Sequence, residues 1–405
     1  MTQENLPASG TTKEVARATR LRELATLYLK LGTISFGGPA AAIALMEDEV
    51  VAKRQWITRQ QFLDMLGVTN LIPGPNSTEM AIIVGLARAG WAGLCLAGAC
   101  FILPAALITA AIAWAYVRFG ALPQAQSLLA GIKPAVIAVI AIAVWRLGRI
   151  AVRNVWLSVL GGAVLGAFLL GANPVAILFG GGLAGMLVER ARAQRREARA
   201  GAKLSAGWTL LKKSFLFPPF AAAAVAPAAK RVPLAQIALF FLKVGAVLYG
   251  GGYVLFAFVE HGLVHDHPWL THHQVLDAIA VGQFTPGPVL STATFIGYLL
   301  GGGWGAAVAT LAIFLPSFLY VAALGPWLPR LRRSPWMAAF LNSVNVCAVA
   351  LMAAVTVRLA IDALRGWPAW VITLAALAAL WKWKVNPAWI VLGGSLAGMA
   401  FSAIR

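Results

Sequence analysis

A short pattern centred on Pro-Gly-Pro occurs twice in this chain, at residues 70–79 and again 213 positions later at residues 283–292. Each copy lies in an apolar stretch, where proline must interrupt a helix because it removes a backbone hydrogen bond. Further residues recur at the same offset: Lys30 with Lys243, Gly37 with Gly250, Gly38 with Gly251, Glu47 with Glu260, and Asp64 with Asp277. The chain is therefore an internal duplication, and its halves are predicted to share one architecture with paired helix breaks.

The composition of the chain restricts its class. Of its 405 residues, 60% are hydrophobic and only 12% are charged, and the mean hydropathy is +0.78. These values exclude a soluble globular protein and predict an all-α polytopic membrane protein. The net charge of +19 comes largely from lysines and arginines in short loops beside apolar segments. We expect these charges to set orientation and to contact membrane lipid, and we expect no nucleic-acid partner.

The duplication divides the chain into four regions. Residues 1–20 form a polar N-terminal tail, 21–189 the first repeat and 234–405 the second repeat. Residues 190–233 form a basic linker that contains an apolar piece at 214–229, a candidate for one extra crossing. The division predicts two repeats of similar length joined by a charged connection.

The distribution of basic residues predicts that the repeats have inverted topology. One loop of the first half contains Lys53, Arg54 and Arg59, whereas its counterpart in the second half, 260–273, contains no lysine or arginine. Two other loops show the opposite bias, with more basic residues in the second half. Because cytoplasmic loops are enriched in lysine and arginine, opposed biases indicate that one repeat is turned over relative to the other.

One point of topology stays open at this stage. A cytoplasmic tail and a cytoplasmic loop at 53–59 cannot flank a single crossing. Either the break at Gly37 and Gly38 turns segment 23–45 back as a re-entrant hairpin, or the charges of that loop lie outside. The same choice between spanning and re-entry applies to segment 61–86.

The doubled breaks point to an anion site. A broken membrane helix exposes backbone groups that lipid cannot satisfy, so such breaks persist where protein or a hydrated cavity surrounds them. Pro75 and Pro288 are predicted to be the first residues of new helices, whose N-terminal amides and positive dipole ends face the break. Paired, Gly/Pro-interrupted segments in two halves are typical of the binding sites of secondary transporters.

The candidate binding residues lie in these breaks and beside them. They are Lys30, Gly37, Gly38, Pro73, Gly74, Pro75, Asn76, Ser77, Thr78, Lys243, Gly250, Gly251, Pro286, Gly287, Pro288, Ser291 and Thr292. The glycines allow close backbone approach to an ion, and the polar side chains supply donors. For Lys30 and Lys243 the alternatives are attraction of the anion, charge pairing, or extension of the ammonium group to the membrane interface.

Acidic residues in or beside the apolar segments are candidates for proton coupling. They are Glu79, Asp64, Asp277, Glu47 and Glu260. Glu79 aligns with Thr292, so it breaks the symmetry of the repeats. The alternative role for Glu79, Asp64 and Asp277 is that of helix N-terminal acids stabilised by the dipole, and for Glu47 and Glu260 that of salt-bridge partners.

All five histidines crowd one loop: His261, His265, His267, His272 and His273. Their spacing does not match the usual zinc templates, so we expect no metal, with a pH-responsive loop or an ordinary hydrated loop as the alternatives. The sequence contains no phosphate-binding Gly-rich motif and no nucleophile–base arrangement. We therefore expect no cofactor and no enzymatic activity.

Several motifs together resemble the chromate ion transporter family, in its two-domain bacterial form. They are Phe36 to Pro39, Trp56 to Asp64, Asn70 to Glu79, Tyr249 to Gly251, and Gln283 to Pro288. The resemblance implies a multi-pass protein of the bacterial inner membrane that exports chromate from the cytoplasm and confers chromate resistance, with protons as coupling ions and sulfate as an alternative substrate. The chain departs from the doubled pattern at Gly252, which replaces a proline, and at Val289 and Leu290.

Two other classes of function are alternatives to a transporter, and a second copy of the chain is a candidate partner. An anion channel would use the same breaks, whereas a membrane oxidoreductase that reduces chromate would need a cofactor or the thiols of Cys95, Cys100 and Cys347. Small-residue pairs such as Gly162 and Gly166 indicate close helix packing, either within the chain or in a homodimer.

Overall fold

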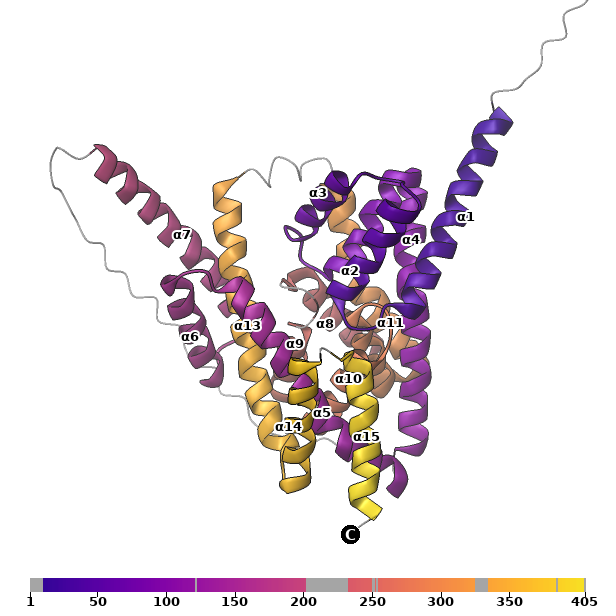
Figure 1. Cartoon of the computed structure of the whole chain (residues 1–405), viewed down its shortest axis with the longest axis vertical. Helices are drawn as coiled ribbons and strands as arrows, with labels where there is room; N and C mark the ends of the chain where they lie inside the picture. The colour runs from indigo at the N-terminus through magenta and orange to yellow at the C-terminus, as the bar shows by residue number, and fades with distance from the viewer. Residues whose placement is uncertain are drawn as a thin grey trace, which may run out of the picture.

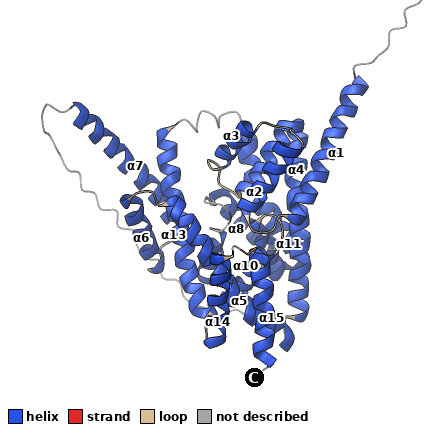
Figure 2. Cartoon of the chain, viewed as in Figure 1, coloured by secondary structure: helices blue, strands red, loops and turns tan. Residues whose placement is uncertain are grey.

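The computed structural model describes residues 10–120, 122–201, 232–249, 252, 254–324, 334–383 and 385–403. In these residues all regular structure is helical (Figure 2). Four helical stretches are long and apolar enough to cross a membrane: Asn76–Phe119, Gln126–Ala151, Val289–Ala323 and Trp336–Ala363. The predicted all-α polytopic membrane class is confirmed.

The described helices fall into two series (Figure 1). The first series is α1 (Gly10–Ile34), α2 (Pro39–Glu47), the π-helix η1 (Asp48–Lys53), α3 (Arg59–Thr69), α4 (Asn76–Phe119), α5 (Pro123–Ala151), α6 (Val155–Leu169) and α7 (Pro174–Gly201). The second is α8 (Leu234–Val247), α9 (Leu255–Glu260), the π-helix η2 (His261–Asp266), α10 (His272–Phe284), the 3-10 turn η3 (Val289–Ser291), α11 (Thr292–Leu324), α13 (Pro335–Ala363), α14 (Trp367–Lys382) and α15 (Pro387–Ala403).

The two series repeat local details as well as element order. Thr58 and Thr271 each form a capping box at the start of α3 and α10, in which threonine and a glutamine three residues on satisfy each other's backbone amides. The π-helices η1 and η2 also lie at matching positions. These features confirm that the chain consists of two homologous repeats.

The sequence offset is interrupted just after the second Pro-Gly-Pro. Gly85 packs on the backbone of Gly93, and the equivalent pair in α11 is Gly297 and Gly305. Each glycine of the first pair is separated from its equivalent in the second by one position fewer than the 213 positions between Pro75 and Pro288. One residue is therefore missing from the second repeat between Pro288 and Gly297, and the fixed offset that aligned Glu79 with Thr292 does not apply across this gap.

The first helix turns back at the glycines that the sequence analysis singled out. The φ angles of Gly37 and Gly38 are +102° and +82°, a region that glycine enters without strain. The turn joins α1 to α2, and the ammonium group of Lys30 in α1 lies 2.9 Å from the carboxylate of Glu49 in η1. This geometry is that of the re-entrant hairpin, one of the two alternatives left open by the loop charges.

Several boundaries expected from the sequence fall inside helices. The helix α1 begins at Gly10, so residues 10–20 of the polar tail form its first turns. The helix α7 extends to Gly201, within the basic linker. The expected extra crossing at 214–229 lies outside the described residues, as do Gly250 and Gly251.

The outer helices pack through glycine. On α5, a Cβ added to Gly131 would overlap the backbone of Gly394 and Gly398 in α15. Small residues let two helix backbones approach closely, which is how helices gain contact in a membrane where lipid competes for apolar surface. The pair Gly394 and Gly398 therefore serves packing within the chain, whereas an added Cβ at Gly162 or Gly166 meets no atom within 4 Å.

We expect Gly131→Val to force α5 away from α15 and to lower the free energy of unfolding by about 1–3 kcal/mol, the usual cost of overpacking. The matched control is Gly162→Val, which places the same side chain on α6 in open space. Thermal unfolding of both purified variants in detergent, followed by tryptophan fluorescence, makes the comparison. Equal destabilisation of the two variants would contradict the packing argument.

Candidate functional site

The two Pro-Gly-Pro loops are interlocked with the helix breaks of the opposite repeat. The amide of Gly74 donates to the carbonyl of Leu248, at the end of α8, over 2.7 Å. The amide of Gly287 donates to the carbonyl of Ser35, at the end of α1, over 3.0 Å. Ser35 and Leu248 are themselves equivalent positions of the repeat. The breaks thus meet in reciprocal pairs, and each satisfies a backbone group that lipid would leave unpaired.

In the first loop, the helix begins one residue later than the sequence predicted. Pro75 has φ −83° and ψ +105° and acts as the N-cap of α4, which starts at Asn76. Pro288 has the same role for the 3-10 turn η3. The expectation that both prolines occupy the first helical position is therefore wrong by one residue, although the helix N-termini still face the breaks.

Polar donors are buried around these breaks. Ser77 and Thr78 in the first turn of α4 are almost fully buried, and so are Ser35 and Gln283 on the chain segments that enter the breaks. Within the described residues, the hydroxyls of Ser35 and Thr78 and the amide nitrogen of Gln283 have no hydrogen-bond partner. Buried donors are normally paired, so these unpaired donors on segments beside the breaks are candidates for contact with a ligand or water.

Other predicted ligands are already engaged. The side-chain amide of Asn76 donates to Asn70 over 2.8 Å, and the hydroxyl of Thr292 donates to the carbonyl of Val289 over 2.8 Å. The hydroxyls of Ser291 and Thr285 lie 3.4 Å apart. The second loop thus offers fewer free side-chain donors than the first, as its Val-Leu sequence leads one to expect.

Glu79 is the acidic group closest to the interlocked loops. Its side chain is fully buried in the first turn of α4. A Cβ added to Gly74 would overlap both its carboxylate and the hydroxyl of Ser317 in α11, so these three groups are in direct contact. In the described part of the chain, Glu79 has no ion-pair partner. A buried carboxylate without a cation is a place where a proton can be carried.

The repeated lysines occupy two different environments. Lys30 is half exposed and pairs with Glu49, which also contacts Lys53 and Arg54. The hydrogen bonds from Lys30 and Lys53 keep the pKa of Glu49 below its usual value despite partial burial. Of the alternatives for Lys30, charge pairing is therefore the one that the structure contains. Lys243 lines a separate, small cavity of about 30 Å³ with residues of α7, α9 and η2.

The four acidic candidates that recur at equivalent positions differ in burial between the repeats. In the first repeat, Glu47 pairs with Arg59 over 3.2 Å and Asp64 accepts a hydrogen bond from Gln60, both near the surface. In the second repeat, the equivalent residues Glu260 and Asp277 are buried, with relative exposures of 0% and 2%. Their environments therefore differ although their sequence positions match.

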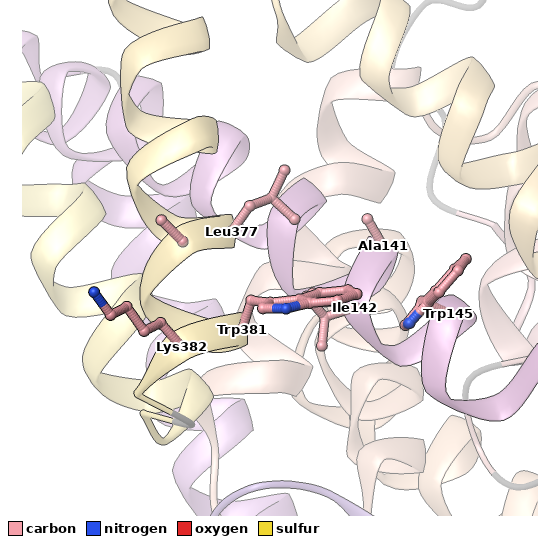
Figure 3. A pocket seen from close by; sticks show the side chains of 7 residues that line it. Ala141, Ile142, Trp145, Leu377, Trp381 and Lys382 are labelled. Atoms are coloured by element: carbon pink, nitrogen blue, oxygen red, sulfur yellow. The ribbon is translucent and has the colours of Figure 1, made fainter. Parts of the chain in front are cut away.

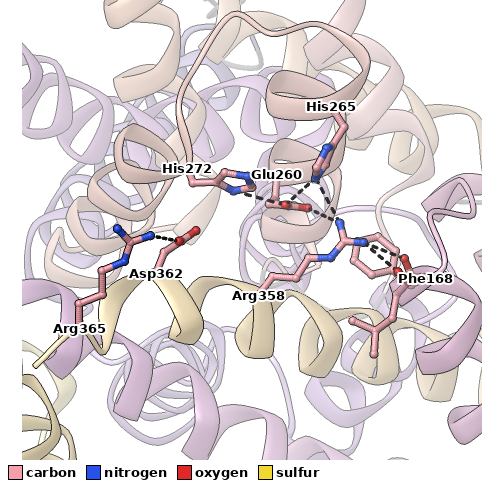
Figure 4. A network of polar contacts seen from close by, with 8 residues as sticks. Phe168, Glu260, His265, His272, Arg358, Asp362 and Arg365 are labelled. Carbon is pink, nitrogen blue, oxygen red and sulfur yellow. Dashed lines mark hydrogen bonds and ion pairs between the residues drawn. The ribbon is translucent and has the colours of Figure 1, made fainter. Parts of the chain in front are cut away.

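Glu260 lies at the centre of a polar network (Figure 4). One carboxylate oxygen lies 3.1 Å from His265 and 3.5 Å from His272, and the other lies 3.7 Å from the guanidinium of Arg358. Arg358 also donates to the carbonyl of Phe168 over 3.1 Å, so the network ties η2 to α6 and α13. The ligand atoms of Glu260, His265 and His272 lie within 4.8 Å of one another, close enough to hold a metal ion. The arginine beside them supplies a positive charge that opposes a cation.

A second buried ion pair includes a residue that the sequence analysis did not select. The ammonium group of Lys133 in α5 lies 3.3 Å from Asp277, and the hydroxyl of Tyr116 in α4 donates to the same carboxylate over 2.8 Å. These three residues line a cavity of about 700 Å³. In the sequence, Lys133 is a single basic residue inside an apolar run. It is not repeated at the offset of 213, so a search for repeated residues does not find it.

A further groove, between α5 and α14, differs in chemistry from these polar sites (Figure 3). It has a volume of about 570 Å³ and is lined by Ala141, Ile142, Trp145, Leu377, Ala378, Trp381 and Lys382. Its walls are apolar apart from the lysine at one edge, and the two tryptophans are more than half exposed. Such a groove suits acyl chains and offers no ligand set for an anion.

Two homologous helical repeats whose broken helices interlock at a donor-rich centre define a membrane transporter. Comparison with known proteins agrees, because residues 22–186 and 235–399 each match the sequence profile of the family described as "Chromate transporter". The chain belongs to the chromate transporter family. This is a membrane transport family, so the chain is not an enzyme.

Individual relatives match over nearly their whole length. A chromate transport protein of Cupriavidus metallidurans is 35% identical over 94% of this chain and 92% of its own. A probable chromate transport protein of Synechococcus elongatus is 33% identical over 95% and 96%, and a chromate transport protein of Pseudomonas aeruginosa is 31% identical over 96% and 94%. No solved structure matches the chain.

We expect Gly74→Ala and Gly287→Ala to abolish most chromate flux without preventing membrane insertion. The added methyl group of the first would overlap Glu79 and Ser317, and that of the second would lie 2.8 Å from Ala105. The control is Gly171→Ala, where φ is also positive but the added atom meets nothing within 4 Å. Flux into everted vesicles, normalised to inserted protein, is measured. Transport by both loop variants at the level of Gly171→Ala would contradict a role for the interlocked loops.

Proposed function

We propose that this chain is a secondary transporter that exports chromate from the bacterial cytoplasm across the inner membrane and thereby confers chromate resistance. The observation that carries the proposal is the interlocking of the two Pro-Gly-Pro loops beside unpaired buried donors, in a chain of the chromate transporter family. A tetrahedral dianion needs several donors at once, and the N-terminus of α4 together with the hydroxyl of Thr78 and the amide of Gln283 supplies that kind of group.

The arrangement of charges supports a sidedness. The start of α1, the helix α3 and the end of α7 lie at the upper end of Figure 1, whereas α15 ends at the lower end. Lys53, Arg54 and Arg59 lie next to or within α3, and the C-terminal half of α7 is rich in arginine. By the positive-inside rule the upper end faces the cytoplasm. The opposite directions in which α7 and α15 end support inverted repeats.

Electrostatics favours export over uptake. A membrane potential that is negative inside contributes roughly 2.3 kcal/mol per charge per 100 mV, so about 4.6 kcal/mol drives a dianion outward. This corresponds to more than about a thousandfold concentration ratio. Proton exchange through Glu79 adds to the driving force and is not needed for direction. Sulfate has the same shape and charge as chromate, so the breaks provide no evident means to reject it.

Direction and selectivity can be tested in one assay. In everted vesicles energised by respiration, chromate export appears as uptake into the vesicles, which should saturate with concentration and be stimulated by chromate on the opposite side. Sulfate, molybdate and phosphate are added as competitors, and sulfate is expected to compete best. Uptake by right-side-out vesicles alone would overturn the proposed direction, and single-channel currents would identify a channel.

We expect Glu79→Gln to abolish the dependence of chromate flux on an imposed pH gradient while flux driven by the membrane potential remains. The substitution keeps the shape of the buried side chain and removes its ability to exchange a proton. Glu47→Gln, which removes a partly exposed carboxylate that pairs with Arg59, is the control and should keep the response. An unchanged response to pH in Glu79→Gln would exclude this residue from proton coupling.

A further inference from the structure

The cavity around Lys133 lies at the end of the molecule opposite to the basic loops. Its walls are the end of α4, the starts of α5, α10 and α14, and the ends of α13 and α15. In Figure 1 this is the lower end, where α5, α14 and α15 are labelled. With the sidedness proposed above, the cavity of about 700 Å³ faces the periplasm. With the proposed direction of transport, this is the end of the molecule at which the exported ion leaves.

The lysine and the arginine that line the cavity are already paired with carboxylates. Lys133 lies 3.3 Å from Asp277, and Arg365 lies 2.8 Å from Asp362. Only 19% of the Lys133 side chain and 3% of that of Asp277 are exposed. Of the two ion pairs, Lys133 with Asp277 is therefore the deep one. A dianion can bind there only if it replaces a carboxylate as the partner of the lysine.

The lysine of the Lys133–Asp277 pair is not repeated in the other half of the chain. Counted from the first residue of each helix, Pro123 in α5 and Pro335 in α13, the equivalent of Lys133 is Asn345. The equivalent of Asp277 is Asp64, which accepts a hydrogen bond from Gln60 in its own helix. The second repeat thus has no lysine at the position equivalent to Lys133. A purely structural ion pair in a membrane is expensive, because the cost of desolvating two charges offsets much of their attraction.

We propose that this cavity is an exit site for the oxyanion, in which Lys133 binds the leaving dianion and Asp277 competes with it as a tethered anion. The proposal rests on the proposed function as an exporter. When the oxyanion contacts Lys133, Asp277 gives up the lysine and stays held by the hydroxyl of Tyr116. When Asp277 returns, the oxyanion is expelled.

A tethered competitor suits an exit site. Because the carboxylate is attached to the same protein, its effective concentration at the lysine is on the order of millimolar or higher. It therefore weakens oxyanion binding without removing the charge that attracts the ion. Lys133 keeps a negative partner throughout the exchange, and the released carboxylate keeps the hydrogen bond from the hydroxyl of Tyr116.

The test is a double-mutant cycle on the purified full-length protein, with equilibrium binding of radiolabelled chromate and, in parallel, of sulfate. We expect Asp277→Asn to tighten binding severalfold and to slow release, Lys133→Gln to weaken binding severalfold, and the double variant to bind like Lys133→Gln. Arg149→Gln, which removes an exposed cation from the same helix outside the cavity, is the control. The cycle isolates the coupling between the two residues.

Each outcome decides between the alternatives. Unchanged or weaker chromate binding in Asp277→Asn, or tightening that persists in the Lys133→Gln background, overturns the tethered-competitor role. If Asp277→Asn does not insert into the membrane, Lys133→Arg and Lys133→Gln are compared instead. The affinity for chromate should be kept in Lys133→Arg and should fall in Lys133→Gln. Equal affinities of the two variants would overturn the exit site. Vesicle flux of the wild type is measured first. Absence of chromate flux there refutes the proposed function, whereas flux with unaltered binding in the variants refutes only the exit site.

Discussion

The structure depends on one constraint, which is that backbone amides and carbonyls exposed by a broken helix must be paired inside a membrane. The chain meets it by reciprocal exchange between its repeats. Gly74 of the first loop donates to the end of α8, and Gly287 of the second donates to the end of α1. Because each repeat completes the other, neither half can satisfy its own breaks alone. This interdependence holds two broken helices and two loops at one place.

Duplication supplied the framework, and divergence between the copies supplied the chemistry. The first copy retains Ser77, Thr78 and Glu79 beside its loop, whereas the second has Val289 and Leu290 and uses its remaining hydroxyls in local hydrogen bonds. The acids at equivalent positions also differ, because Glu260 and Asp277 are buried whereas Glu47 and Asp64 lie near the surface. Equivalent positions of the two copies thus carry different polar environments.

Repetition in the sequence does not identify which lysines are buried. Repetition at a fixed offset selected Lys30, yet this lysine is half exposed and held by Glu49. Lys133 is largely buried, and it has no repeated partner because its equivalent is Asn345. Repetition identifies what the fold needs twice, and a function that distinguishes inside from outside needs some groups only once. A single ionisable residue in an apolar run is the better indicator of such groups.

The sequence by itself determined the membrane class, the duplication and the position of the breaks, because hydropathy, offset and proline chemistry are local properties of the chain. It also predicted that the loops at Gly74 and Gly287 bind an anion. Only the tertiary structure decided which breaks meet, that α1 turns back as a hairpin, and that Asp277 pairs with Lys133 across 144 residues of sequence. These contacts join segments that are distant in the sequence, two of them across the repeats, and no periodicity within one segment encodes the partner that another segment brings to it.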